Sequence, residues 1–488
     1  MTTATMATPL QADYLIVGAG AAGMAFADTL LSSSNKTMMI VDRYARPGGH
    51  WTVAYPFVRL HQPSSLYGVN SRPLGSDTVD EVGLNKGLSE LAGRDEITAY
   101  YDQVMHQTFL PSERVQYFPK HEYLGRGRFR SLLTGVDCCV GPETRIVDGT
   151  YSRVKVPSVV PPAYSVAAGV KLVTPNNLSS ITRPYANYTV CGAGKTGIDC
   201  CLWLLTNGVS ADKITWIMPR DPLYMDRAGL QFGARFTAQT RKALHKTNIT
   251  VMKSSSTKDL VQRLVHSELL LQLDRDKPAT TFHAATVTHA ELEQIRKIKN
   301  IIRKGRILRI TTANVELTEG SCAADKDTLY VDCTASALAQ VPPVPVFQNK
   351  TIILQTIRFC QPVFSAALIA FVEATYDKES TKNELCRVVA YPDIPADWPL
   401  LQLQSHLNTI RWSREDGLTK WSSSARLDWL AIPEKGAEMG KIATSLGPVC
   451  EKLRSLLDGI SDERERRRVA RSMERFENGA LGQPSERL

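Results

Sequence analysis

The chain has 488 residues, of which 43% are hydrophobic and 22% charged, as in ordinary globular proteins of two or three domains. Lys and Arg outnumber Asp and Glu by 58 to 49, but the basic residues are dispersed along the chain. The densest basic stretch, Arg464 to Arg475, is interleaved with glutamates at helical spacing, which favours a solvated helix over a nucleic-acid patch. The composition therefore argues against a nucleic-acid partner.

The ten cysteines contain no CxxC pair, so neither a zinc knuckle nor a dithiol redox motif is predicted, and we expect no metal. Thiols within apolar runs favour a reducing compartment. The first twelve residues have no Lys, no Arg and no apolar core, so they resemble neither a signal nor a transit peptide. We expect a cytoplasmic protein without a membrane span, and the sequence leaves its oligomeric state open.

The segment from Tyr14 to Asp42 has the pattern of a dinucleotide-binding unit. An apolar run of strand length leads into GAGAAG at 18–23, a helix follows, and a second apolar run ends in Asp42. The first glycine of such a motif allows a tight turn, the second a close approach to pyrophosphate, and the third close helix-on-strand packing. The final acid has the spacing that suits a ribose. The segment therefore predicts a first Rossmann-like domain.

Residues 46–67 mix aromatic and polar side chains too densely for an ordinary surface loop. In a doubly wound fold this segment should lie outside the carboxyl ends of the strands, where ligands bind. Gly48 and Gly49 could pass close to a flat ligand. The side chains that could line an isoalloxazine ring are His50, Trp51, His61 and Gln62. The alternative for each histidine is that it only satisfies local backbone groups.

The first pattern returns after a proline-rich crossing. A strand at 188–191 leads into GAGKTG at 192–197, and the next strand, 214–218, is followed by Arg220 instead of an acid. An arginine there suits a 2′-phosphate and predicts a preference for NADPH over NADH. The alternative is that Arg220 only pairs with Asp221. Two nucleotide folds imply two nucleotides and hydride transfer between them.

The later segments complete this scheme. Residues 224–303 are predicted to form a long helical insertion, in which Thr288 and Glu291 have the spacing of a capping box. The apolar run 329–335 is predicted to carry the chain back into the first domain. A helix with proline in its first turn is expected over 363–374, and its N-terminus could stabilise a reduced flavin. Gln361 and Pro362 are therefore candidate contacts. Helices are predicted from about Trp398 onward.

Together, GAGAAG with its acid, GGHW at 48–51, YPFVR at 55–59 and GAGKTG resemble the two-dinucleotide flavoproteins related to class B flavin monooxygenases. The similarity covers most of residues 13–375. It implies FAD in the first domain, NADPH as its reductant, and a C4a-(hydro)peroxyflavin that uses molecular oxygen to oxygenate a small organic substrate.

This resemblance, with the residue patterns, gives the expected site. The residues expected on FAD are Gly18, Ala19, Gly20, Ala22, Gly23, Asp42, Arg43, Gly49, His50, Trp51, Gln361 and Pro362. Those expected on NADPH are Gly192, Gly194, Lys195, Thr196, Gly197 and Arg220. The candidate catalytic residues are Arg59, His61 and Gln62.

The predicted fold is α/β, with two Rossmann-like dinucleotide-binding domains and a helical C-terminal region. The FAD domain, 13–165 and 329–397, is interrupted by the NAD(P) domain, 185–328, and 398–488 form the helical region.

Two departures indicate a divergent branch. Residues 165–188 contain neither Phe nor His, so the FxGxxxHxxxW/F fingerprint is absent. In addition, His61 stands where YPxxRxD has aspartate. Three functions remain open: an NADPH-dependent monooxygenase, a flavin oxidase or dehydrogenase, and a non-enzymatic, redox-responsive FAD-binding protein.

Overall fold

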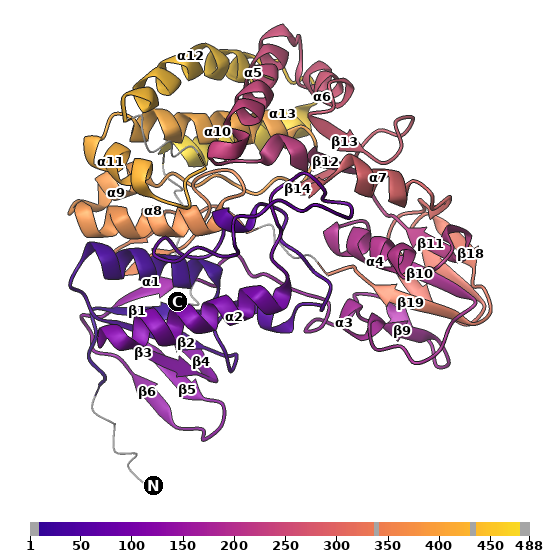
Figure 1. Cartoon of the computed structure of the whole chain (residues 1–488), viewed down its shortest axis with the longest axis horizontal. Coiled ribbons are helices and arrows are strands. Elements are labelled where there is room, and N and C mark those ends of the chain that lie inside the picture. Colours follow the sequence, from indigo (N-terminus) through magenta and orange to yellow (C-terminus); the bar gives the residue numbers. More distant parts are fainter. Residues whose placement is uncertain (1–8, 336–340, 430–435, 479–488) are drawn as a thin grey trace.

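A computed structural model of the chain describes residues 9–335, 341–429 and 436–478. Figure 1 shows two α/β units side by side, with a group of helices lying across one end of the molecule. Each unit is built on a largely parallel sheet whose central strands are buried and mostly apolar, as expected for strands covered on both faces. The predicted α/β class with two Rossmann-like units is confirmed.

The first unit contains a sheet with the strand order β20-β21-β7-β1-β2-β3. Its strands are β1 (Tyr14–Val17), β2 (Met38–Asp42), β3 (Val115–Pro119), β7 (Arg145–Asp148), β20 (Phe347–Gln348) and β21 (Thr351–Ile353). The helices α1 (Ala21–Ser33) and α8 (Pro362–Thr375) pack against each other on this sheet, and α2 (Arg94–Val104) also belongs to its core. A small antiparallel sheet, β4 (His121–Gly125), β5 (Arg128–Ser131) and β6 (Asp137–Cys139), projects beyond it.

The second unit contains five parallel strands in the order β15-β11-β10-β19-β9. Their bounds are β9 (Lys171–Val173), β10 (Asn187–Cys191), β11 (Ile214–Ile217), β15 (Asn300–Ile302) and β19 (Thr328–Asp332). Its helices α3 (Pro175–Leu178) and α4 (Lys195–Thr206) belong to the same core. A second, smaller sheet consists of β8 (Ser165–Val166), β16 (Ile307–Ile310), β17 (Asn314–Leu317) and β18 (Gly320–Ala323).

The strand predicted to return the chain to the first domain belongs to the second one. β19 pairs in parallel with β10, with Leu329 opposite Tyr188, and on its other side with β9. An apolar run shows that a strand is buried, but it carries no information about which sheet buries it. The expected return at 329–335 is therefore wrong. The chain re-enters the first sheet at β21, which pairs with β7.

The expected helical insertion is a mixed subdomain, so that prediction is also wrong. Three strands, β12 (Pro222–Asp226), β13 (Leu270–Gln272) and β14 (Thr281–Val287), form a sheet beside α5 (Thr237–Lys253), α6 (Thr257–His266) and α7 (His289–Ile295). The capping box predicted at Thr288 and Glu291 is present at the start of α7. The helix ends at Ile295 because residues 300–302 extend and pair with β11.

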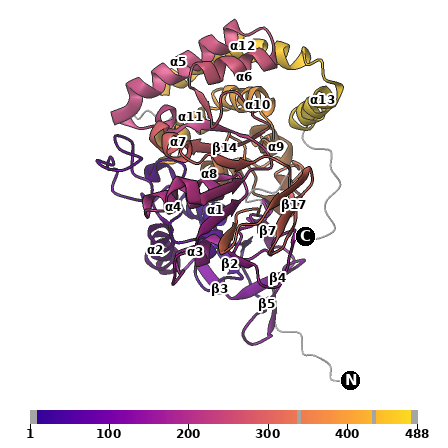
Figure 2. The same ribbon diagram turned by 90° about the vertical axis from the view of Figure 1, so that its right-hand side faces the viewer.

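The C-terminal region is helical in the described residues, as predicted. It contains α10 (Asp397–Trp412), α11 (Asp416–Ser424), α12 (Gly436–Asp458) and α13 (Glu463–Asn478), and α9 (Glu379–Leu385) precedes it in the segment predicted to belong to the FAD domain. α10 and α12 share an apolar core with α6 and β14, so this region rests on the subdomain of the second unit (Figure 2). Within the described ranges no helix is long and apolar enough to cross a membrane.

Gly23 tests how closely α1 packs on β1. A Cβ added there would lie 2.0 Å from the carbonyl oxygen of Gly18, so Gly23→Ala must move backbone. We expect a loss of about 3 kcal/mol in the free energy of unfolding, measured by urea denaturation. Gly417→Ala in α11, where nothing lies within 4 Å, is the control and should change stability by less than about 1 kcal/mol. Equal effects of the two changes would contradict the packing argument.

Candidate functional site

The first glycine-rich turn joins β1 to α1. Gly18 has φ +99°, and its N–H donates to the carbonyl of Val41 at 2.8 Å, so the turn is tied to the end of β2. The last residue of β2, Asp42, accepts a hydrogen bond from the Ala19 N–H at 2.6 Å. The predicted acid therefore lies directly at the predicted turn.

The carboxylate of Asp42 is buried. Burial raises its pKa, while hydrogen bonds from the backbone N–H groups of Tyr44 and Ala19, and the charge of Arg43, oppose the rise. The Arg43 side chain itself is exposed. Each carboxylate oxygen has two lone-pair directions, so the two backbone bonds leave acceptor capacity for ribose hydroxyls.

The GGHW segment lies against this turn. Gly48 donates its N–H to the carbonyl of Ala19 at 2.8 Å, and a Cβ added to Gly49 would lie 2.9 Å from the Cα of Gly20. Gly49 also has φ +58°, a conformation that favours glycine. Only glycines allow the two backbones to approach so closely. The segment therefore covers the second glycine of the motif.

The aromatic residues after these glycines are held in place. Trp51 is buried and its indole N–H donates to the hydroxyl of Tyr67 at 2.7 Å. The His50 ring lies 5.1 Å from that of Trp51, and burial lowers the pKa of His50 to about 4. His50 is therefore neutral at physiological pH.

The N-terminus of α8 contributes a buried acceptor at the same edge of the sheet. β21 runs parallel to β7 and β1, so α8 begins at the edge where α1 begins. Gln361 precedes Pro362, the first residue of α8, and is 2% exposed. Its side-chain oxygen has no hydrogen-bond partner among the described residues. A buried amide oxygen in this state fits a ligand that brings an N–H donor.

The second glycine-rich turn makes the same helix-on-strand contact as the first, but it is not covered by a backbone segment at its second glycine. A Cβ on Gly197 would lie 2.2 Å from the Gly192 oxygen, which repeats the helix-on-strand contact of Gly23. Gly192, at φ +116°, packs just as closely against the carbonyl of Cys333. Gly194 is exposed, and an added Cβ there would meet nothing within 4 Å. The first turn is thus covered by backbone, whereas the second is open.

The start of α4 is tied to the first unit. Lys195 forms an ion pair with Asp199 one turn later, and the hydroxyl of Tyr55 donates to the same carboxylate at 2.7 Å. Thr196 also hydrogen-bonds to Tyr55, and the next aromatic residue along, Phe57, stacks on Trp203. The YPFVR segment therefore connects the first glycine turn to the helix of the second.

Arg220 follows β11, as predicted, but it pairs with Asp393 and not with Asp221. Its guanidinium donates to Asp393 at 2.9 Å, while Asp221 is paired with Arg303 at the end of β15. The alternative that Arg220 only pairs with Asp221 is therefore wrong. The side chain of Arg220 remains 36% exposed.

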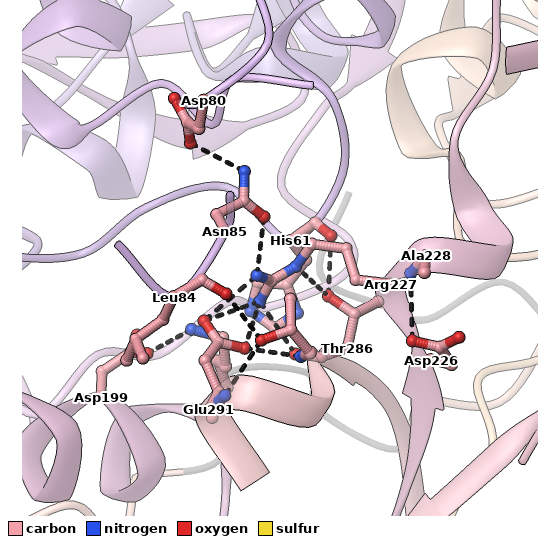
Figure 3. Close-up of polar contacts among 12 residues, drawn as sticks. His61, Asp80, Leu84, Asn85, Asp199, Asp226, Arg227, Ala228, Thr286 and Glu291 are labelled. Carbon is pink, nitrogen blue, oxygen red and sulfur yellow. Dashed lines mark hydrogen bonds and ion pairs between the residues drawn. The ribbon is translucent and has the colours of Figure 1, made fainter. Parts of the chain in front are cut away.

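A buried arginine joins the two units beside His61. Figure 3 shows His61, Asn85, Thr286 and Glu291 arranged around Arg227. The Arg227 guanidinium donates to Glu291 at 2.8 Å and to the side-chain oxygen of Asn85 at 3.0 Å. Thr286 in turn donates to the backbone oxygen of His61 at 2.7 Å. Two segments of the first unit are thereby bonded to β14 and α7 of the second.

The three candidate catalytic residues have different surroundings. Burial, with the nearby charges of Lys195 and Arg227, holds the pKa of His61 well below its ordinary value, so its imidazole is neutral. Gln62 donates to the carbonyl of Leu66 at 3.0 Å. Arg59 is exposed and donates to the backbone oxygen of Leu91. Of the three, His61 belongs to the junction between the units, and the catalytic roles stay predictions.

Comparison with known proteins agrees with the first motif and identifies relatives. Residues 16–58 match the family model of an NAD(P)-binding Rossmann-like domain. The uncharacterized proteins Rv2000 of Mycobacterium tuberculosis (strain H37Rv) and Mb2023 of Mycobacterium bovis are each 47% identical to the chain over 471 residues, which is 94% of this chain and 87% of theirs. The chain belongs to their family.

Some solved structures also resemble this chain. Cyclohexanone monooxygenase in its open form matches with a TM-score of 0.47 and 12% identity, covering 89% of this chain and 98% of its own. OTEMO in complex with FAD and NADP matches at 0.44 and 10%, covering 75% and 85%. Flavin-containing monooxygenase from Stenotrophomonas maltophilia matches at 0.41 and 12%, covering 74% and 97%.

No sequence motif marks most of the residues at the junction between the two units. Arg227, Asn85 and the ion pair partner Asp199 belong to no motif, and their partners are distant in sequence. Glu291 did carry a signal, because it is the third helical residue of the predicted capping box. That signal indicated a helix start and gave no indication of a buried arginine beside it.

The half-buried His50 gives a pH prediction. A histidine with a pKa near 6.5 in the unfolded chain and about 4 in the folded one binds protons more readily when unfolded. Stability should therefore fall as the pH is lowered from about 6.5 to 4, and His50→Gln should flatten that fall by up to about 1.4 kcal/mol per pH unit. Urea denaturation across this range measures it. The exposed His106 provides the control, and equal flattening by His106→Gln would contradict the assignment.

Arg227 gives a prediction about the junction. Arg227→Met leaves the Glu291 carboxylate without its cation, so we expect a loss of about 3–5 kcal/mol in unfolding free energy. Adding Glu291→Gln should restore part of it, and a double-mutant cycle measures the coupling. The exposed pair Arg275–Glu268 is the control, where Arg275→Met should cost less than about 1 kcal/mol. Purely additive effects at 227 and 291 would exclude the proposed coupling.

Proposed function

We propose that the protein is an FAD-dependent, NADPH-using monooxygenase that inserts oxygen into a small organic substrate. One observation carries the proposal: a single segment of chain contacts the first glycine-rich turn and the helix that begins at the second. Gly48 is bonded to Ala19 of the first turn, and Tyr55 is bonded to Asp199 on the helix that follows the second. Two dinucleotides bound at these turns would be held in fixed relation to each other, as hydride transfer requires.

The residues of the first turn fit FAD. Backbone N–H groups at the start of α1 suit a pyrophosphate, and the Asp42 carboxylate retains acceptors for a ribose. The unpartnered oxygen of Gln361, at the start of a second helix, suits an N–H of the flavin ring. Bound FAD would supply the redox and oxygen chemistry. Trp51 and the neutral His50 would line the site without adding charge.

The residues of the second turn fit NADPH. The open backbone at Gly194 would admit the pyrophosphate, and the ends of the cofactor would extend toward Arg220 and the junction. Arg220, still partly exposed, would exchange its contact with Asp393 for the 2′-phosphate. The side chains of Lys195 and Thr196 lie at the first turn of α4, where they would meet the phosphates.

At the junction, residues of the chain itself would provide hydrogen bonds to a substrate and balance the local charge. The neutral His61 imidazole offers one nitrogen lone pair and one N–H, so it can accept or donate a hydrogen bond to a substrate without becoming charged. Lys195 and Arg227 are each paired with a carboxylate, so they keep His61 neutral without leaving unbalanced charge.

The ten free thiols suit a reducing compartment such as the cytoplasm.

Stopped-flow spectroscopy of the FAD-loaded protein tests the proposal. NADPH should bleach the flavin, and oxygen should then produce a transient that absorbs in the near ultraviolet before the oxidised spectrum returns. If an organic compound reduces the flavin but NADPH does not, the proposal is wrong and the protein is an oxidase or dehydrogenase. A flavin that neither reagent reduces would indicate a non-enzymatic FAD protein.

Arg220→Ala tests the nucleotide preference. Loss of a charge-assisted contact to the 2′-phosphate should raise the KM for NADPH about tenfold or more, while the KM for NADH changes little. Steady-state flavin reduction with each nucleotide gives both values. Arg263→Ala, which removes a comparably exposed aspartate-paired arginine from α6, is the matched control. Equal changes for NADPH and NADH in Arg220→Ala would remove the assignment.

A further inference from the structure

One stretch of the second unit's subdomain is strongly basic. Between Asp226 and Asp259 the chain contains no acidic residue, and α5 lies within this stretch. The cations on α5 are Arg241, Lys242, Lys246 and Lys253, and all four side chains are exposed. The helix therefore presents positive charge that no acid of its own offsets.

The same helix also exposes apolar side chains. Leu244, Ile249 and Met252 are 45%, 40% and 48% exposed, which makes α5 unusual among the described helices. Positions 242, 246, 249 and 253 follow one another at intervals of three or four, so lysines and an isoleucine share one stripe. Met252, three residues after Ile249, lies beside this stripe, whereas Leu244, seven residues before the buried Val251, lies on the other side of the helix. Ile249 and Met252 are thus combined with three lysines on a single exposed face.

The opposite face of α5 fixes the helix to the molecule. Thr250 and Val251 are buried, and Val251 belongs to the apolar core shared with α12. Figures 1 and 2 show α5, α6 and α12 gathered at one end of the molecule, away from the two parallel sheets. The exposed face is therefore presented outward by a well-anchored helix.

We infer that this face of α5 binds the surface of an anionic lipid membrane. A helix that lies in the interface of a membrane needs lysines for the phosphate headgroups and apolar side chains that reach the acyl boundary, and α5 has both on one face. Exposed Leu, Ile and Met gain nothing from a nucleic-acid backbone. If two copies of the chain paired through this face, the positive charges of their α5 helices would repel each other, which opposes such pairing.

The helix is also bonded to the segment that leads to the junction. Gln239 and Thr240, in its first turns, donate to the backbone oxygens of Ala228 and Gln231. Gln231 in turn accepts a hydrogen bond from the N–H of Ser89 in the first unit. A membrane under α5 would thus lie next to the chain segment that contains Arg227. The inference concerns lipid binding and does not depend on the proposed function.

Vesicle flotation of the full chain tests the inference. The protein should float with vesicles of phosphatidylcholine containing about one fifth phosphatidylserine, far more weakly with phosphatidylcholine alone, and less as salt is raised. Lys242→Glu with Lys253→Glu should lower the affinity by about thirtyfold or more, because each basic residue near an anionic surface contributes about fivefold. Ile249→Gln with Met252→Gln should also abolish flotation, with helix propensity largely preserved.

Two matched variants control for charge and apolar content. Lys86→Glu with Lys155→Glu changes two exposed lysines elsewhere, and Leu132→Gln with Leu133→Gln changes the exposed turn between β5 and β6. Both should float like the wild type, and unfolding midpoints should show that all variants are folded. The inference is overturned if the wild type ignores anionic vesicles, or if the α5 variants still float. It is also overturned if the α5 variants bind vesicles as the wild type does and have lost only self-association or binding to duplex DNA.

Discussion

The junction between the two nucleotide units is built around one buried arginine, Arg227, which pairs with Glu291 of its own unit and donates a hydrogen bond to Asn85 of the other. The arginine is 1% exposed, so its charge would be costly unless every strong partner stayed in place. Those partners include Asn85 from the first unit and Glu291 from the second. Separation of the units would leave a buried cation short of acceptors. The junction is therefore specific as well as stable, and the neutral imidazole of His61 lies within it.

The same turn chemistry serves two different purposes in the two units. Gly23 and Gly197 make nearly identical contacts with the preceding turns, so both helices start at the same height above their sheets. Their covers differ, because Gly49 packs on Gly20 while Gly194 is open. A covered turn suits a cofactor that remains bound, and an open one suits a cosubstrate that exchanges. This difference agrees with the proposed assignment of FAD to the first turn and NADPH to the second.

Local sequence patterns predicted the parts of the molecule whose causes are local. Both glycine turns, Asp42 at its turn, and the capping box of α7 depend on residues close together in the chain, and all were predicted correctly. β19 and Arg227 depend on partners far away in the chain, and no local pattern distinguishes those partners from the alternatives. A buried apolar strand fits either sheet equally well. An arginine is ordinarily exposed, so nothing in the sequence around Arg227 indicates that it is buried.

The C-terminal region is part of the first site, although it lies far from it in the sequence. Arg426 donates to the backbone oxygens of Ser65, Tyr67 and Val69, and Tyr67 is the residue that accepts the hydrogen bond of Trp51. The loop behind the GGHW segment is therefore held by a residue about 360 positions later in the chain. Because a ligand that binds only the folded state stabilises everything that builds its site, a dinucleotide at the first turn would stabilise the chain from Tyr14 to this loop.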